Sequence, residues 1–378
     1  MAETQSSQII TINPNNGFCP QTKIYHSLRP AVPLPPLSQP LSITQYALSL
    51  ATATALSTTP FLIDAATANC LTYSTFLRQV ASLSSSLRSI LSANDVAFVL
   101  SPPSLHIPVL YFSLLSLGVV VSPSNPLSSP SELSHQVRLC KPAVAFATSE
   151  TCRKIPQHIS TILLDSPQFT SMLVPDPSVT ANDAVVNQSA AAAILYSSGT
   201  TGKVKGVVLT HRNLIAIIAD KSNEENDDAR IQPVSLFTLP LFHVFGFFML
   251  IRAAALGESV VIMEKFDFAK MLEAVERYRV TYIPVTPPLV VALAKSDLVD
   301  KYDLSSLQTL GCGGAPLGKE VAERFREKFP HVEIFQVQTN FVGVQANIAT
   351  FLFFFLSIFF FRMLSCTMMV FLTAFFCV

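Results

Sequence analysis

The chain lacks an excess of either charge. Its 378 residues carry 25 Lys and Arg against 25 Asp and Glu, so the formal net charge is zero. Without a basic field, nothing in the chain attracts nucleic acid or an anionic membrane surface. Only 13% of the residues are charged, whereas 50% are hydrophobic. That composition is more apolar than an average soluble domain, and part of the excess lies in residues 348–378.

Paired cysteines and a leader segment are lacking too. The seven cysteines form no Cys-x-x-Cys motif, and no histidine lies at metal-ligand spacing from them. An odd, scattered set is typical of reduced thiols in an intracellular protein, so we expect no structural zinc. Residues 1–10 are polar and do not fit a secretory signal. The cysteines are Cys19, Cys70, Cys140, Cys152, Cys312, Cys366 and Cys377.

Proline is frequent in residues 1–42. Such a segment cannot form a helix, so we expect an extended lead-in that lies over a surface. The pattern changes at Ile43, where residues 43–56 predict a helix. Residues 61–64 and 71–74 then predict a short hairpin. The prolines are Pro14, Pro20, Pro30, Pro33, Pro35, Pro36 and Pro40.

Short apolar strands then alternate with helical stretches. Near-continuous apolar strands separated by helices favour parallel sheets covered on both faces, so the predicted fold class is α/β. No internal repeat accompanies this alternation. The predicted strands are 96–100, 119–122, 143–147, 161–164, 192–196, 206–209, 234–239, 259–263 and 281–283. The predicted helices include 109–117, 131–140 and 269–278.

A loop rich in hydroxyls and glycines lies between two predicted strands. Residues 196–206 read Tyr-Ser-Ser-Gly-Thr-Thr-Gly-Lys-Val-Lys-Gly. Glycines let backbone N–H groups turn inward around an anion, and lysine supplies positive charge. The segment is not a Walker A loop, because Ser197 replaces the first glycine and Val204 follows Lys203. A generic P-loop NTPase is therefore excluded, and an ordinary polar surface loop is the alternative.

This loop, continued through Thr210 and His211, resembles the signature of the adenylate-forming superfamily. Within it, the chain looks most like the plant 4-coumarate–CoA ligase-like branch, with Val204 where that family usually has proline. The resemblance implies that the loop holds the triphosphate of ATP and then the departing pyrophosphate, with Lys205 also catalytic. The implied ATP-binding residues here are Ser197, Ser198, Gly199, Thr200, Thr201, Gly202 and Lys205.

A second segment, residues 239–246, reads Leu-Pro-Leu-Phe-His-Val-Phe-Gly and resembles another signature of that family. The resemblance implies that His243 is catalytic and lies beside the acyl carboxylate. A satisfied core histidine is the alternative. Phe245, Gly246 and Phe247 would line the acyl pocket together with His243. Their apolar character implies a fatty or arylpropenoic acid as substrate.

A third segment, residues 311–318, reads Gly-Cys-Gly-Gly-Ala-Pro-Leu-Gly and resembles the turn that carries the adenine of ATP. Small residues let a purine ring approach the backbone closely. A helix-capping turn before a helix at 319–329 is the alternative, and both can hold together. The implied ATP-binding residues are Gly313, Gly314, Ala315, Pro316 and, at the end of the next strand, Gln336.

The resemblance, which begins near residue 8, stops at Gln336. The family continues with Gly-Tyr-Gly and then Thr-Glu, whereas Phe341 and Val342 occupy the threonine and glutamate positions here. An apolar pair cannot coordinate Mg²⁺, which prefers oxygen ligands, so no metal site is predicted. The 378 residues also contain no counterpart of the ribose-binding aspartate, the hinge or the small C-terminal domain with its lysine.

An almost wholly apolar tail fills residues 348–378, with Arg362 near its middle. As a helix, its 31 residues would reach about 46 Å, more than the roughly 30 Å of a bilayer core. A hydrophobic C-terminal helix that spans a membrane is therefore one interpretation, although Arg362 would cost about 2.5–3.5 kcal/mol there. The other, which we favour, is translation of a thymine-rich non-coding stretch. Either way, exposed phenylalanine runs predict aggregation.

The domain organisation that follows has three parts. We expect the lead-in at 1–42, an incomplete AMP-binding N-terminal domain of layered flavodoxin-like parallel sheets at 43–336, and an unrelated tail at 337–378. The implied reaction activates a hydrophobic carboxylic acid with ATP and Mg²⁺ through an acyl-adenylate and passes it to coenzyme A. We expect negligible thioester formation from this chain, because several of the implied contacts are absent together.

The alternative function is a non-catalytic, membrane-anchored protein that binds a lipid or carboxylate. The implied partners are thus ATP and a hydrophobic acid, with no nucleic acid and with a membrane if the tail inserts. We expect an intracellular protein. Complete relatives of this branch are often peroxisomal, but Phe376, Cys377 and Val378 replace the Ser-Lys-Leu type of address.

Overall fold

The computed structural model of the chain describes residues 11–26, 28, 32–54, 58–174, 184–197, 204–222 and 233–337. Several of the predictions lie outside these residues: Ser198, Gly199, Thr200, Thr201 and Gly202 of the loop, Phe341 and Val342, and the apolar tail at 348–378. In the described part of the chain, no helix combines the length and the apolar character needed to cross a membrane.

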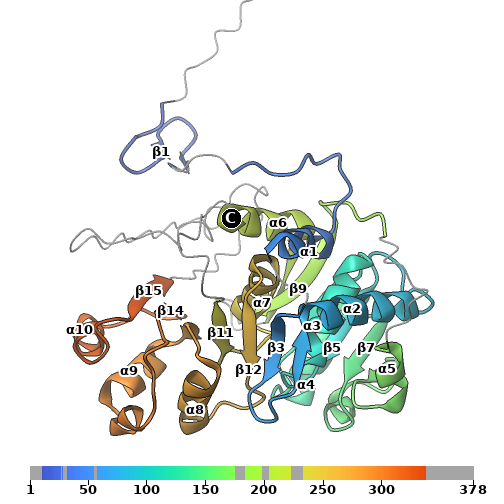
Figure 1. Ribbon diagram of the computed structural model, residues 1–378. Helices are drawn as coiled ribbons and strands as arrows, with labels where there is room; N and C mark the ends of the chain where they lie inside the picture. Colours follow the sequence, from blue (N-terminus) through green and yellow to red (C-terminus); the bar gives the residue numbers. More distant parts are fainter. Residues whose placement is uncertain are drawn as a thin grey trace, which may run out of the picture.

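Two sheets form the body of the molecule (Figure 1). The first has six strands in the order β10-β9-β6-β5-β7-β8, parallel except for the antiparallel pair β9–β10. Its strands are β5 (Val96–Leu100), β6 (Val120–Pro123), β7 (Val144–Ala147), β8 (Thr161–Leu163), β9 (Ala191–Ser197) and β10 (Lys205–Thr210).

The second sheet has seven strands in the order β15-β14-β13-β11-β12-β3-β4, with only β3–β4 antiparallel. Its strands are β3 (Pro60–Asp64), β4 (Cys70–Thr72), β11 (Val234–Phe237), β12 (Ser259–Ile262), β13 (Tyr282–Val285), β14 (Thr309–Gly313) and β15 (Glu333–Val337). A separate hairpin pairs β1 (Phe18–Cys19) with β2 (Ile24–Tyr25) and lies apart from both sheets in Figure 1.

The predicted α/β class is confirmed, but the sheets are mixed rather than wholly parallel. Both antiparallel pairs follow short connections, at residues 65–69 and 198–204. A short connection can only reverse the chain into an antiparallel neighbour, whereas a parallel pair needs a crossover of a dozen or more residues. The predicted hairpin near residues 61–74 is therefore confirmed as β3–β4, and parallel pairing holds for the other neighbours.

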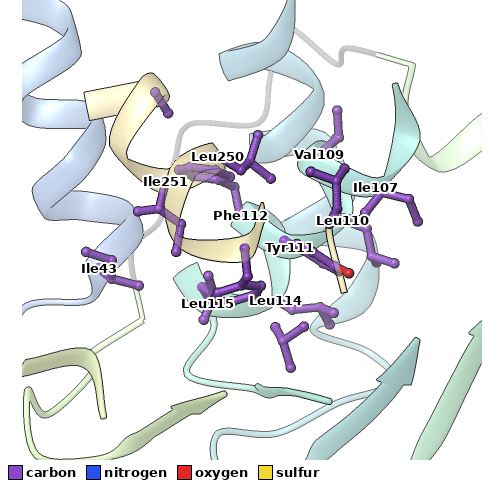
Figure 2. Close-up of a cluster of buried hydrophobic side chains, with 14 of the residues drawn as sticks. Ile43, Ile107, Val109, Leu110, Tyr111, Phe112, Leu114, Leu115, Leu250 and Ile251 are labelled. Carbon is purple, nitrogen blue, oxygen red and sulfur yellow. The ribbon is translucent and has the colours of Figure 1, made fainter. Parts of the chain in front are cut away.

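A layer of helices lies between the two sheets and shares one continuous core with both. Figure 2 shows Ile43 of α1 and Leu250 and Ile251 of α7 gathered around side chains of α3, such as Leu110 and Phe112. The same core includes residues of both sheets. The helices of this central part are α1 (Ile43–Thr54), α2 (Tyr73–Leu87), α3 (His106–Ser116), α6 (His211–Ser222) and α7 (Val244–Leu256).

Further helices cover the outer faces of the sheets. A second core joins the seven-stranded sheet to α8 (Phe268–Tyr278), α9 (Pro287–Lys295) and α10 (Lys319–Lys328). A third, smaller core lies under α4 (Pro130–Cys140) on the six-stranded sheet. The other described helix is α5 (Pro167–Met172), and two short 3₁₀ helices lie at Thr151–Lys154 and Asp297–Lys301. Every parallel sheet face that needs burial is therefore packed against helices.

Local sequence signals explain where several helices begin. Helix α4 starts with a full capping box, in which Ser129 and Glu132 satisfy each other's backbone N–H groups, and Pro130 takes the first helical position. Helix α8 starts at Asp267, whose side chain accepts from the Lys270 N–H at 3.0 Å. The lead-in is tied down as well, because Gln188 Nε2 donates to the Pro36 and Gln39 carbonyls at 2.8 Å.

Candidate functional site

The carboxyl ends of the parallel strands in the seven-stranded sheet meet at one edge. Strand β11 is the point at which the chain changes direction, since β12 lies on one side of it and β13 on the other. In open α/β sheets, ligands bind in the crevice outside such a switch point. The segment that carries His243 follows β11, and the turn that begins at Gly314 follows β14. The fold therefore brings two of the predicted segments to the same edge.

His243 is the N-cap residue of α7, and its side chain is exposed at the edge. Its Nδ1 atom accepts a hydrogen bond from the Phe245 N–H at 3.3 Å. An accepting Nδ1 leaves the proton of the neutral ring on Nε2. Neighbouring atoms partly desolvate the ring and lower the pKa of His243, which favours this neutral form. The imidazole can therefore present an Nε2–H donor to a carboxylate oxygen.

Gly246 lets α7 approach the segment before it. A Cβ atom at Gly246 would lie 2.2 Å from the carbonyl oxygen of Pro240, so no other residue fits without a shift. Phe245 and Phe247 are buried in the central core, and the Phe247 ring lies 5.3 Å from that of Tyr111. These contacts hold the start of α7 firmly under His243. A lining role for these residues in an acyl pocket remains a prediction.

The two strands that flank the predicted phosphate loop are paired directly. Ser197 at the end of β9 lies opposite Lys205 at the start of β10, and Lys205 is exposed. The base of this hairpin is attached to the sheet, because the Tyr196 and Ser122 hydroxyl oxygens lie 2.7 Å apart. His135 of α4 also contacts the Val204 carbonyl through Nε2, at 3.2 Å. The strand pairing therefore fixes the backbone position of Lys205, whose side chain is exposed to solvent.

The predicted adenine turn is open to solvent. Gly313 ends β14 in a buried position, and Gly314 follows with φ +88°, a conformation that favours glycine. No described atom lies within 4 Å of the position that a Cβ on Gly314 would take. Ala315 and Pro316 are exposed. The backbone here can thus receive a flat ring at close range.

Gln336 is not placed on the same face as the glycines. It lies on β15 opposite Cys312, whose side chain belongs to the core under α8–α10. Gly311 and Gly313 alternate with Cys312 and so face the α7 side of the sheet. The side chain of Gln336, which is exposed, accordingly lies on the opposite face from Gly311 and Gly313. Its predicted role in ATP binding remains a prediction.

A cavity of about 260 Å³ opens at the same edge, next to the first turns of α8 and α9. The Thr238 hydroxyl, on its wall, donates to the Pro284 carbonyl at 2.8 Å and so joins the ends of β11 and β13. Sequence reasoning missed this cavity, because its walls come from three separate segments. Its lining residues are Thr238, Leu239, Phe266, Phe268, Thr286, Pro288, Leu289 and Ala292.

Ligands for a metal ion are not gathered anywhere in the described part of the chain. No three His, Cys, Asp or Glu side chains there lie close enough together to hold an ion. Among the described residues, the carboxyl edge of the seven-stranded sheet offers an imidazole and backbone groups, and Lys205 lies on the other sheet.

Comparison with known proteins agrees with the family resemblance of the sequence motifs. Residues 51–338 match the family model described as "AMP-binding enzyme". The chain is 51% identical over 353 residues to 4-coumarate–CoA ligase-like 9 of Arabidopsis thaliana, covering 89% of this chain and 62% of that protein. It is 46% identical over 339 residues to 4-coumarate–CoA ligase-like 5 of Oryza sativa subsp. japonica, covering 86% of this chain and 62% of the relative. The chain thus spans less than two thirds of these relatives.

A solved structure supports the fold alone. The N-terminal domain of FACL13 from Mycobacterium tuberculosis superposes with a TM-score of 0.69 at 20% sequence identity. The superposition covers 79% of this chain and 76% of that domain. At this identity, the likeness concerns the arrangement of strands and helices and not the ligands.

Proposed function

The chain belongs to the AMP-binding enzyme family, and on that premise we propose that it binds ATP and a hydrophobic carboxylic acid in the manner of acyl-CoA ligase-like proteins. The observation that carries the proposal is the position of His243. It stands at the carboxyl edge beside the switch-point strand, with Nδ1 already engaged and Nε2 left to donate. A neutral imidazole held in this way can donate one hydrogen bond to the carboxylate of an acid.

ATP would lie across the same edge. The open turn at Gly313, Gly314, Ala315 and Pro316 would take the adenine, since no described atom fills the space over Gly314. Lys205 and Ser197 would face the phosphates, together with the loop residues between them. Helix α6 contacts both β10 and α7 and so links the hairpin of Lys205 to the helix that His243 caps.

Bound ATP would supply an α-phosphate for attack by the carboxylate, which yields an acyl-adenylate and releases pyrophosphate. The chain's own residues would position the reacting groups and stabilise the charge that develops on them. Lys205 would balance charge that develops on the phosphates, and His243 would orient the attacking carboxylate. Mg²⁺ would be held chiefly by phosphate oxygens, because the described residues gather no set of acidic ligands.

We further propose that this chain forms little or no coenzyme A thioester. Phe341 and Val342 stand where the resembled motif has threonine and glutamate, and neither side chain can replace an oxygen ligand. Thioester formation at the rate of a full-length relative such as 4-coumarate–CoA ligase-like 9, tested with the same acids, would overturn this statement.

Nucleotide binding tests the main proposal. Displacement of a fluorescent ATP analogue by MgATP would be measured for the whole chain and for two variants. Lys205→Met should weaken binding by about tenfold, as expected for one lost charge-assisted contact. Lys301→Met, which removes an exposed lysine from a 3₁₀ helix away from this edge, should leave binding unchanged. No displacement at millimolar MgATP would refute the proposal.

The acid is tested separately through ATP–pyrophosphate exchange with a panel of arylpropenoic and fatty acids. Acid-dependent exchange that falls strongly in His243→Ala, with ATP binding intact, supports the assigned roles. Acid binding that does not depend on ATP and persists in His243→Ala would favour the alternative of a non-catalytic carboxylate-binding protein.

A further inference from the structure

A buried tyrosine lies over a bare stretch of strand β14. A Cβ atom at Gly311 would lie 2.2 Å from the hydroxyl oxygen of Tyr282 and 3.0 Å from its Cζ atom. The phenol ring therefore extends from β13 across the backbone of its neighbour, into space that any other residue at position 311 would occupy. The Tyr282 hydroxyl is buried and has no hydrogen-bond partner among the described residues.

The ring lies on the same side of the sheet as α7. Ile283 and Val285 face the core under α8–α10, so Tyr282 and Pro284 face the other way. Tyr282 packs against the central core, and the residue as a whole is partly buried. Its side chain thus lies on the α7 side of the sheet, with the hydroxyl against β14.

Two glycines connect this ring to the candidate site. Gly311 and Gly313 share the α7 face of β14, and Gly313 leads directly into the open turn at Gly314. Two residues of strand cover about 7 Å. Over that length β14 carries no side chain of its own on the α7 face, and the Tyr282 ring covers the Gly311 end.

An ion pair between Arg252 and Glu258 lies near the Tyr282 ring. Arg252 of α7 lies 2.6 Å from Glu258, and the second carboxylate oxygen of Glu258 accepts from the Ser235 hydroxyl at 3.1 Å. Ser235 on β11 is the strand neighbour of Tyr282. The charges of Arg252 and Glu258 act on the Tyr282 hydroxyl in opposite directions, while burial raises its pKa. An apolar chain that reached past the ring would meet this pair.

We propose that Tyr282 closes the far end of the acid pocket and so determines the length of the acid that the site accepts. The proposal rests on the function proposed above, because it takes the carboxylate to lie beside His243. The rest of the acid would then extend over Gly313 until it meets the phenol ring that covers Gly311. Acids that end at the ring fit, and longer unbranched acids do not.

Rates of ATP–pyrophosphate exchange with straight-chain acids of increasing length test this role. Each rate reports how well the site activates an acid of that length. Tyr282→Ala should shift the preferred length upward and raise the exchange rate with the longer acids by about tenfold, as expected for added methylenes in an apolar pocket. Among long acids, those with a hydroxyl or keto oxygen at the far end should gain most, because the opened end borders Arg252. Tyr282→Leu is a smaller change that should shift the length preference in the same direction.

Tyr282→Phe is the matched control. It keeps the ring over Gly311 and removes only the unpaired hydroxyl, so its length preference should equal that of the unmodified chain. This inference would be overturned if the unmodified chain showed acid-dependent exchange while folded Tyr282→Ala and Tyr282→Leu kept the same preference for acid length. The proposed function would still stand. Absence of any acid-dependent exchange or acid binding in the unmodified chain would overturn both.

Discussion

The Nδ1 atom of His211 accepts a hydrogen bond from the backbone N–H of Ile43 at 3.1 Å. The bond joins the first residue of α6 to the first residue of α1, which lies 168 positions earlier in the chain. Both residues are fully buried. His211 therefore satisfies one of the first N–H groups of α1, which have no partner within the helix, while Ser42 accepts from the Gln45 N–H at 3.1 Å.

Burial without a charge partner lowers the pKa of His211 to about 4. An unfolded histidine titrates near pH 6.5, so the unfolded chain binds this proton more readily than the folded chain. The stability that this difference provides is complete above pH 6.5 and is lost as the pH falls from 6.5 towards 4. At pH 5 the free energy of unfolding should be lower than at pH 7.5 by on the order of 2 kcal/mol from this group alone.

Urea unfolding of the whole chain at the two pH values measures this loss. His211→Asn keeps an acceptor near the Ile43 N–H but does not titrate, so it should remove most of the difference attributed to His211. His158→Gln changes an exposed histidine and should leave the pH dependence as it was. If His211→Asn loses as much stability between pH 7.5 and pH 5 as the unmodified chain, the protonation of His211 is not the cause.

Gly246 offers a test of the contact that positions His243. In Gly246→Ala, the new methyl group would lie 2.2 Å from the Pro240 carbonyl oxygen. The start of α7 or the preceding segment must then shift, and we expect a loss of about 1–3 kcal/mol in the free energy of unfolding. Because His243 lies between Pro240 and Gly246, the KM for the acid should rise more than the KM for ATP.

Gly318→Ala is the comparison for this change. Gly318 precedes α10, and no described atom lies within 4 Å of its missing Cβ. Its substitution should cost less than about 1 kcal/mol, the usual range for an N-cap change. Equal destabilisation by the two substitutions would show that the Pro240 contact is not what requires glycine at position 246.

Much of the fold could be predicted from the pattern of residues. The strand predicted at 96–100 has those bounds in β5, and the helix predicted at 269–278 begins one residue earlier in α8. Strand β5 is a short, continuously apolar run, and α8 has its buried residues on one face at helical spacing. Helix α7 was not delimited from the sequence. Residues 244–251 are all buried, so no polar face marks its period.

The candidate site could be predicted only as separate segments. Motifs indicated Lys205, His243 and the glycine turn, and the fold places the last two at one edge of the seven-stranded sheet. The pattern could not show that Gln336 faces away from Gly311 and Gly313, since that depends on its register with Cys312. Nor could it show that Tyr282 fills the space over Gly311, because the contact joins two strands through side-chain direction. Such relationships arise from tertiary packing and leave no local trace.

The buried ion pair of Arg252 and Glu258 allows a last prediction about stability. Their side chains are 18% and 6% exposed, and Glu258 is also bonded to Ser235. Removal of one partner leaves the other charge buried without compensation. Arg252→Met or Glu258→Met alone should therefore lower the free energy of unfolding by about 3–5 kcal/mol.

The double variant Arg252→Met, Glu258→Met removes both charges together. Burial of two apolar chains in place of a desolvated pair is often neutral, so the double variant should be more stable than either single one. Urea unfolding of the four chains gives the coupling energy between the two sites. Asp303→Ala, which breaks the exposed pair with Arg279, should change stability little. Additive losses in the double variant would mean that Arg252 and Glu258 stabilise the fold through their other contacts and not through each other.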